Sequence, residues 1–351
     1  MDHDCLNIVT LSANEYKTWL TYEFEYLNDA FSIDNRFRNL KLGRFRPKNF
    51  NNLTDIESVE NFFNGQSPDA LLIDISFMGE KDSEDNFLKD ILAHYKDKSF
   101  IILKTADPWR QIDWVEELQL NYNPNAYLIH SKKYTEMFNE KLSDTKASAY
   151  MFPYCFGRRY FNMGLEREFD VGLIGRCELE AHLLNKKSFR KRGCEKLNVF
   201  YEPSLSKIRK KIGRKNYLSR YAQLILNLNQ VMVSWNSPVR PKGQRDHCHT
   251  PFRYVEAPAC GTISLTPHHF EELNEFYFPK ETYLCCDNSI ERAISQITSL
   301  KNEPESYLEL QKKAYEIAMG NHQAQNRVDF LYNLIKGNEK VDVRDFYKIG
   351  I

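Results

Sequence analysis

Short apolar runs alternate with segments of helical periodicity, and this alternation constrains the fold more than any other feature of the chain. Apolar residues recur near a period of 3.6 in segments such as 87–95 and 132–142, which separate the runs. This alternation predicts βαβ units and a mainly parallel sheet with helices on both faces. The expected strands of the first half are 6–11, 70–75, 100–104, 126–129 and 149–152.

A second series of the same kind begins after residues 158–167, which we interpret as a linker. Its expected strands are 169–174, 197–201, 230–234, 262–265 and 282–285. We therefore predict an α/β protein with two Rossmann-like domains that face one another across a cleft. The expected domains are 1–160 and 161–325, followed by a C-terminal helix and tail at 326–351. Open parallel sheets bind ligands beyond the carboxyl ends of their strands, so we expect the site in those loops.

Charge and cysteine usage exclude several classes of protein. Lys and Arg total 48, equal to Asp and Glu, so the net charge indicates no partner. The longest aliphatic stretches, 71–73 and 101–103, are far shorter than the roughly 20 residues of a membrane span. The eight cysteines form no CxxC pair, and no signal peptide is visible, so we expect a cytoplasmic protein with reduced thiols. A zinc site built from 247–249 and 285–286 is disfavoured, because adjacent ligands wrap an ion poorly, and we expect no metal.

The segment 249–266 is the most informative part of the chain. Thr250 and Pro251 are typical of an N-cap and a first helical residue, and Gly261 is typical of a helix end. A helix start with a positive dipole end suits a phosphate, and Arg253 could add a charge-assisted contact. Glu256, one turn further, could accept hydrogen bonds from both ribose hydroxyls of a nucleoside diphosphate. The alternative is a solvated Arg–Glu pair on a surface helix.

Several segments resemble those of one enzyme family. The run from Arg253 to Thr262 resembles the signature of GT-B fold glycosyltransferases, in the CgeB-like branch of glycosyl transferase group 1. Weaker similarities occur in the same order along the chain, at Thr105–Trp109, Phe169–Gly175, Glu271–Tyr277, and His322 with Arg327. The resemblance covers residues 100–335. It implies transfer of a hexosyl or pentosyl group, without metal or other cofactor, from a nucleotide sugar to an acceptor hydroxyl.

The family also implies roles for particular residues. The C-terminal domain would hold the donor, with Glu256 on its ribose and Arg176 on its diphosphate. The backbone N–H groups of Thr250, Pro251 and Phe252 would bind the same diphosphate. The N-terminal domain would hold the acceptor, and the last helix would cross back to that domain. Retention of anomeric configuration is the family's expected outcome.

One position departs from the family pattern. Many group 1 enzymes have a second glutamate eight residues before the one on the ribose, and this chain has Cys248 there. His249 is the candidate that replaces its sugar contact, although it fits a loop histidine equally well. The departure motivates an alternative, a non-catalytic protein that binds a nucleotide sugar or glycan. Asp107 follows an expected strand and could act on the acceptor hydroxyl, or it could only cap a turn. His130 has the same two interpretations.

A basic stretch motivates a second alternative. Residues 186–215 hold twelve Lys or Arg against two Glu, a local balance of +10. This balance could attract an anionic polymer, and the function could then be sugar transfer to nucleic acid. It fits a solvated face of the second domain as well. The sugar, the acceptor and the oligomeric state are not indicated by the sequence.

Overall fold

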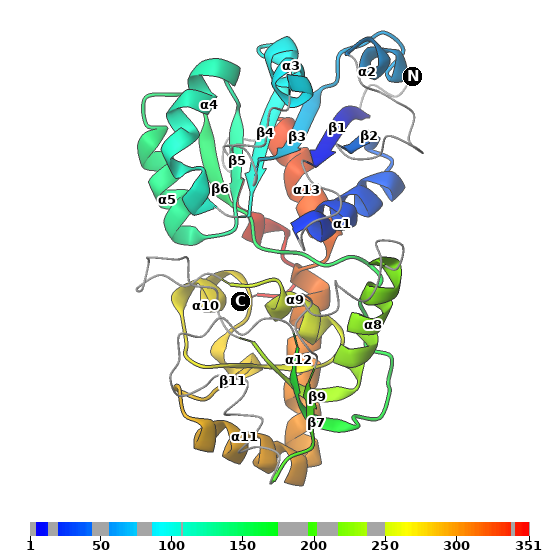
Figure 1. The fold of residues 1–351 in the computed structure, drawn as a ribbon, viewed down its shortest axis with the longest axis vertical. Helices are drawn as coiled ribbons and strands as arrows, with labels where there is room; N and C mark the ends of the chain where they lie inside the picture. Colours follow the sequence, from blue (N-terminus) through cyan, green and yellow to red (C-terminus); the bar gives the residue numbers. More distant parts are fainter. Residues whose placement is uncertain are drawn as a thin grey trace. The chain divides into compact units, whose positions relative to one another are not determined.

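The computed structural model divides the chain into two compact units (Figure 1). The N-terminal domain comprises 1–153 and 324–346, and the C-terminal domain comprises 154–323 and 347–351. The structure describes residues 5–12, 20–43, 56–75, 86–106, 108–174, 196–201, 217–236, 250–337 and 341–350.

The N-terminal domain contains a six-stranded, wholly parallel sheet in the order β2-β1-β3-β4-β5-β6. Strand order reverses between β1 and β3, which is where doubly wound sheets bind ligands. The pairing places Asp74 opposite Lys104 at the carboxyl edge. The strands are β1 (Leu6–Ser12), β2 (Phe37–Gly43), β3 (Ala70–Asp74), β4 (Phe100–Thr105), β5 (Ala126–Ile129) and β6 (Ser148–Met151).

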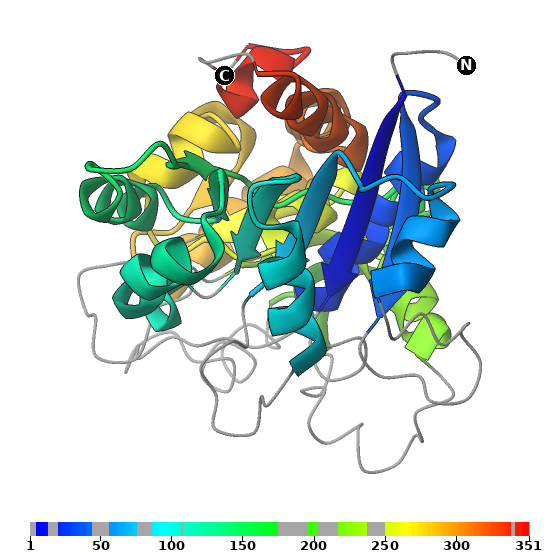
Figure 2. The same cartoon turned by 90° about the horizontal axis from the view of Figure 1, so that it is seen from above.

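Helices cover both faces of this sheet, as Figures 1 and 2 show. On one face lie α2 (Ile56–Phe62), α3 (Asn86–Tyr95), α4 (Val115–Tyr122) and α5 (Lys132–Lys141). The short helices η1 (Pro108–Arg110) and η2 (Ile112–Trp114) precede α4. On the other face α1 (Leu20–Ile33) packs against α13 (Ala324–Ile335), which is followed by η5 (Val343–Phe346). The central strands are therefore buried on both faces, which explains their continuous apolar sequence.

The C-terminal domain has a five-stranded parallel sheet in the order β11-β10-β9-β7-β8, which reverses between β7 and β9. Its strands are β7 (Phe169–Leu173), β8 (Val199–Tyr201), β9 (Val231–Trp235), β10 (Ile263–Thr266) and β11 (Leu284–Cys285). Its helices are α8 (Tyr217–Asn229), α9 (Arg253–Ala259), α10 (Glu271–Phe276), η4 (Lys280–Thr282), α11 (Ile290–Asn302) and α12 (Pro304–Asn321).

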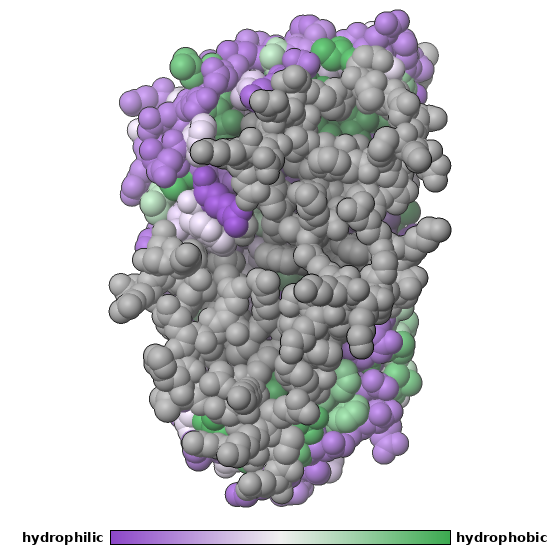
Figure 3. All heavy atoms as spheres, in the orientation of Figure 1, coloured by the Kyte–Doolittle hydropathy of each residue, from purple (hydrophilic) through white to green (hydrophobic). Residues whose placement is uncertain are grey.

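All ten expected strands are present, and the prediction of two Rossmann-like α/β domains is confirmed. Helix α1 and strand β2 are also present, although the sequence pattern did not predict them. In the part of the chain that the structure describes, no helix combines the length and the apolar character needed to cross a membrane. Near α4 and α5, hydrophilic side chains dominate the coloured surface and apolar ones are scattered among them (Figure 3).

Candidate functional site

Helix α9 lies at the carboxyl edge of the C-terminal sheet, where ligands bind in this type of fold. Its residue Tyr254 fixes this position. The Tyr254 hydroxyl lies 2.8 Å from the carbonyl oxygen of Asn236, which follows β9, and 2.6 Å from Oγ1 of Thr266, which ends β10. All three residues are buried. The helix is therefore attached to the ends of two adjacent strands.

The helix begins later than the sequence pattern predicts. Its first residue is Arg253, and Tyr254 N–H donates to the carbonyl of Pro251 at 3.1 Å, so a turn precedes the helix. Thr250 is not its N-cap. The Thr250 backbone N–H and hydroxyl both donate to Oε1 of Glu272, at 2.9 and 3.0 Å. The prediction of a Thr250 N-cap was wrong because α9 begins at Arg253, with Phe252 at the N-cap position, which leaves Thr250 outside the helix end.

This arrangement corrects the predicted diphosphate contacts. The N–H of Thr250 is already bound to a carboxylate, which would also repel a phosphate. Pro251 cannot donate, because proline has no backbone N–H. Phe252 stays a prediction. The start of α9 alone therefore gives little support to a phosphate site.

The end of α9 agrees with its prediction. Gly261 has φ +69°, Thr262 N–H donates to the Ala257 carbonyl at 2.9 Å, and Gly261 N–H donates to Pro258 at 2.8 Å. This is a Schellman motif, which requires the left-handed conformation at the glycine. Arg167 Nη2 adds a charged donor at 2.9 Å from the Gly261 carbonyl. The rigid end fixes the rotation of the helix, and with it the direction of Glu256.

Glu256 is buried, with only 3% of its surface exposed. The Tyr160 hydroxyl donates to its Oε1 at 2.6 Å, and Arg253 Nη1 lies 2.9 Å from its Oε2. The Arg253–Glu256 pair therefore exists, but it is a buried pair rather than the solvated one of the alternative interpretation.

A second cluster of charges lies at the carboxyl edge of the N-terminal sheet. Lys104 is near the end of β4, His130 follows β5, and Glu23 comes from α1. Glu23 Oε2 lies 2.6 Å from Lys104 Nζ and 3.0 Å from His130 Nε2, and all three side chains are almost completely buried. His130 Nδ1 is also hydrogen-bonded to the carbonyl of Phe152. Of these three residues only His130 was a candidate from the sequence, because Glu23 and Lys104 are distant from it along the chain.

The cluster shifts two pKa values in the acidic range. Burial favours the neutral form of Glu23, but the adjacent His130 and Lys104 outweigh it and lower the Glu23 pKa to about 2. Burial lowers the pKa of His130, although the Glu23 carboxylate opposes the change. The folded cluster is therefore expected to hold an ionised Glu23 near pH 7.

We expect the protein to lose stability as the pH falls from 8 to 5. Below the ordinary histidine value of 6.5, residue 130 takes up a proton in the unfolded chain more readily than in the folded one. Glu23 acts in the same direction below its ordinary value of 4.5. Thermal unfolding across this range should show a shallower fall for His130→Gln than for the wild type. Identical pH profiles would contradict the assigned His130 shift.

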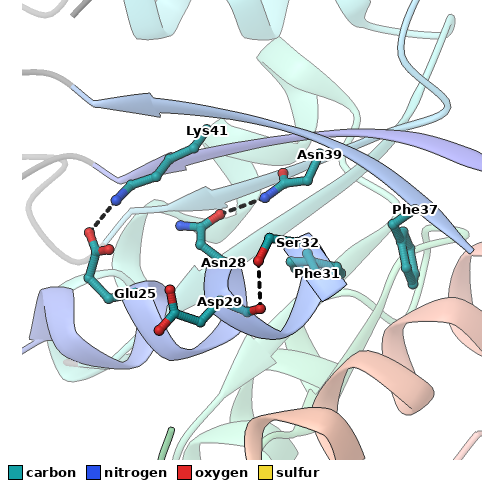
Figure 4. A pocket seen from close by; sticks show the side chains of 8 residues that line it. All are labelled: Glu25, Asn28, Asp29, Phe31, Ser32, Phe37, Asn39 and Lys41. Carbon is teal, nitrogen blue, oxygen red and sulfur yellow. Dashed lines mark hydrogen bonds and ion pairs between the residues drawn. The ribbon is translucent and has the colours of Figure 1, made fainter. Parts of the chain in front are cut away.

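A shallow pocket of about 420 Å³ lies beside the edge strand β2 (Figure 4). Asn28 Oδ1 accepts hydrogen bonds from Thr10 Oγ1 at 2.5 Å and Asn39 Nδ2 at 2.9 Å, and Lys41 pairs with Glu25. The pocket is thus polar, and many of its groups bind one another. It is lined by Glu25, Asn28, Asp29, Phe31, Ser32, Phe37, Asn39 and Lys41.

Other predicted residues divide into two groups. Asp107, Arg176 and His249 lie outside the described residues, as does most of the basic stretch 186–215. Two other residues of the resemblance have structural partners. His322 Nε2 lies 2.8 Å from the Tyr277 carbonyl, and Arg327 Nε donates to Pro153 at 2.8 Å. Both side chains are completely buried, so these contacts give each residue a structural role.

Comparison with known proteins supports the fold, and the family match includes the α9 segment. Residues 187–333 match the family model described as Glycosyl transferase-like. No curated protein matches the sequence.

Three solved structures are similar over nearly the whole chain. Sucrose-phosphate synthase from Thermosynechococcus elongatus has a TM-score of 0.60 at 9% identity, over 95% of this chain and 100% of its own. T4 phage BGT, in complex with its UDP-glucose substrate, has 0.55 at 10% identity, over 94% and 99%. A Listeria monocytogenes protein assigned as a UDP-N-acetylglucosamine 2-epimerase has 0.51 at 11% identity, over 97% and 98%. The fold is therefore GT-B.

Proposed function

We propose that this protein is a glycosyltransferase that moves a sugar from a nucleoside diphosphate to an acceptor hydroxyl. One observation carries the proposal: the segment matching a glycosyl transferase-like family contains a buried carboxylate, Glu256, on a helix fixed at the carboxyl edge of a parallel sheet. The GT-B fold supports sugar-nucleotide chemistry, and the UDP-glucose complex of T4 phage BGT makes a UDP-sugar the first donor to test.

On the donor side, we propose that Glu256 accepts hydrogen bonds from both ribose hydroxyls. Its Tyr160 and Arg253 partners would hold the carboxylate in place beside the nucleotide. Arg176 and Phe252 are the proposed diphosphate contacts. If transfer proceeds without a metal ion, cationic side chains must stabilise the charge that grows on the departing diphosphate.

On the acceptor side, we propose a site at the carboxyl edge of the N-terminal sheet. The buried cluster of Glu23, Lys104 and His130 lies at that edge, and Asp107 follows β4 in the sequence. His130 contacts Glu23 and Phe152 through its two ring nitrogens. We therefore propose that it holds these residues in place at the sheet edge and does not take a proton from the substrate. Asp107 stays the proposed base, and His249 the proposed sugar contact.

We also propose four finer features. The CgeB-like branch, retention of configuration and the lack of a metal requirement are implied by the resemblance. A cytoplasmic location is proposed from the cysteine usage and the lack of a visible signal peptide. The alternatives are a non-catalytic protein that binds a nucleotide sugar, and transfer to nucleic acid through the basic stretch 186–215.

The proposal is tested by incubating the protein with a panel of nucleoside diphosphate sugars and measuring release of free nucleoside diphosphate. We expect at least one donor to be turned over, slowly with water as the acceptor and faster with a suitable hydroxyl. Binding without release would favour the non-catalytic alternative. An epimerised sugar would point to the chemistry assigned to the Listeria protein, and no binding by any donor would contradict the proposal.

A further inference from the structure

Three potential metal ligands lie together at the carboxyl edge of the C-terminal sheet. His269 lies in the loop after β10, Cys285 ends β11, and Asp287 lies in the loop after it. One possible ligand atom of each residue lies within 4.8 Å of those of the other two. The two strands are neighbours, with Thr266 paired to Cys285, so adjacent loops bring the three side chains together.

The hydrogen bonds around His269 leave one ring nitrogen without a proton, so that nitrogen could bind a metal ion. The Tyr283 hydroxyl donates its proton to Asn274 Oδ1 at 2.8 Å, so its oxygen accepts from His269 Nδ1, also at 2.8 Å. This places the imidazole proton on Nδ1 and leaves the lone pair on Nε2. Metal-binding histidines almost always donate their other N–H to a fixed partner in this way.

The other two ligands, Cys285 and Asp287, share the proton of the thiol, and a metal ion could replace that proton. The Cys285 thiol donates to Asp287 Oδ1 at 3.2 Å. Asp287 Oδ2 pairs with Arg292, which orients the carboxylate and leaves Oδ1 toward the sulfur. An ion that displaces the thiol proton to solvent would bind sulfur and oxygen together. Its two positive charges would then be balanced by the negative charges of the Cys285 thiolate and the Asp287 carboxylate.

We propose that His269, Cys285 and Asp287 bind one divalent transition-metal ion, of which Zn²⁺ fits best, with water as a fourth ligand. Nitrogen, thiolate and carboxylate ligands suit zinc and disfavour Mg²⁺ and Ca²⁺, which prefer oxygen alone. The ion would link the loops that follow β10 and β11. This site uses none of the residues of the proposed sugar transfer. It also differs from the zinc site considered from sequence, because it includes neither Cys286 nor residues 247–249.

The test is a titration of the reduced, metal-free protein with Co²⁺, which gives a charge-transfer absorption when bound to thiolate. We expect the band to saturate at one equivalent in the wild type and in Cys286→Ser, the matched control. We expect Cys285→Ser and His269→Gln to lose it. A wild type without the band, or a band that survives in Cys285→Ser, would overturn the proposal. His269 is exposed, so His269→Gln keeps the test decisive if Cys285→Ser does not fold.

A second variant separates a true site from loose binding to the cysteine. Tyr283→Phe leaves all three ligands in place and removes only the acceptor of the His269 Nδ1 proton. Loss of such a partner weakens metal binding by about 10- to 100-fold in known sites, and we expect the Co²⁺ dissociation constant to rise by that factor. An unchanged constant would mean that His269 does not bind the ion in the proposed tautomer, and would overturn the assignment.

Discussion

Replacing Lys104 by methionine is expected to lower the free energy of unfolding by about 3–5 kcal/mol. The substitution keeps the length of the side chain but leaves the Glu23 carboxylate buried without its closest cation, which lies 2.6 Å away in the wild type. Urea denaturation of the two proteins at pH 7 measures the difference. A fall below about 1 kcal/mol would show that Lys104 and Glu23 are not a buried pair in solution.

Two further variants identify the cause of that loss. The double variant Glu23→Gln with Lys104→Met removes both charges, and we expect it to regain most of the lost stability, because a buried pair is costly mainly when broken. Lys313→Met is the matched control, since Lys313 pairs with Glu309 on the exposed surface of α12. We expect no measurable change in that protein. A double variant no more stable than Lys104→Met alone would indicate a packing effect instead.

Glu256→Gln is expected to weaken binding of a nucleotide-sugar donor by about 10- to 100-fold. A hydrogen bond to a charged group contributes about 1.5–3 kcal/mol, and glutamine replaces one carboxylate oxygen with a donor that cannot accept from a ribose hydroxyl. Glutamine has nearly the same shape, and Oε1 can still accept from Tyr160. Calorimetric titration with the donor identified by turnover measures the effect.

Tyr160→Phe is the control for that experiment. It removes a hydrogen bond to the same carboxylate but leaves the charge for the ribose, so we expect donor affinity within about threefold of the wild type. Melting temperatures establish that both variants are folded. Equal donor affinity in Glu256→Gln and the wild type would remove Glu256 from the donor site, and an equal loss in both variants would assign it a structural role.

The sequence predicts most of the fold because central parallel strands are buried on both faces. Runs such as 71–73 and 101–103 show this directly. Strand β2 was missed because it is the edge strand: Arg38 and Asn39 precede Leu40, and Lys41 separates Leu40 from Leu42, so its apolar run is interrupted. Helix α1 did carry a signal, since Phe24, Leu27 and Phe31 share one buried face.

The site was harder to predict than the fold, because its decisive contacts join distant parts of the chain. The acceptor of the Thr250 N–H is Glu272, which follows the next strand, and no local pattern predicts that pair. The charged cluster joins α1 to the ends of β4 and β5. By contrast, the Schellman end at Gly261 was predictable, because it depends on a glycine at one local position.

A crystal structure of the protein with UDP would show whether Glu256 binds the ribose of a nucleoside diphosphate. We expect both Glu256 carboxylate oxygens within hydrogen-bonding distance of the two ribose hydroxyls, with Tyr160 and Arg253 still in contact with the carboxylate. A ribose bound elsewhere, or a carboxylate whose only partners are protein side chains while UDP occupies another site, would contradict it.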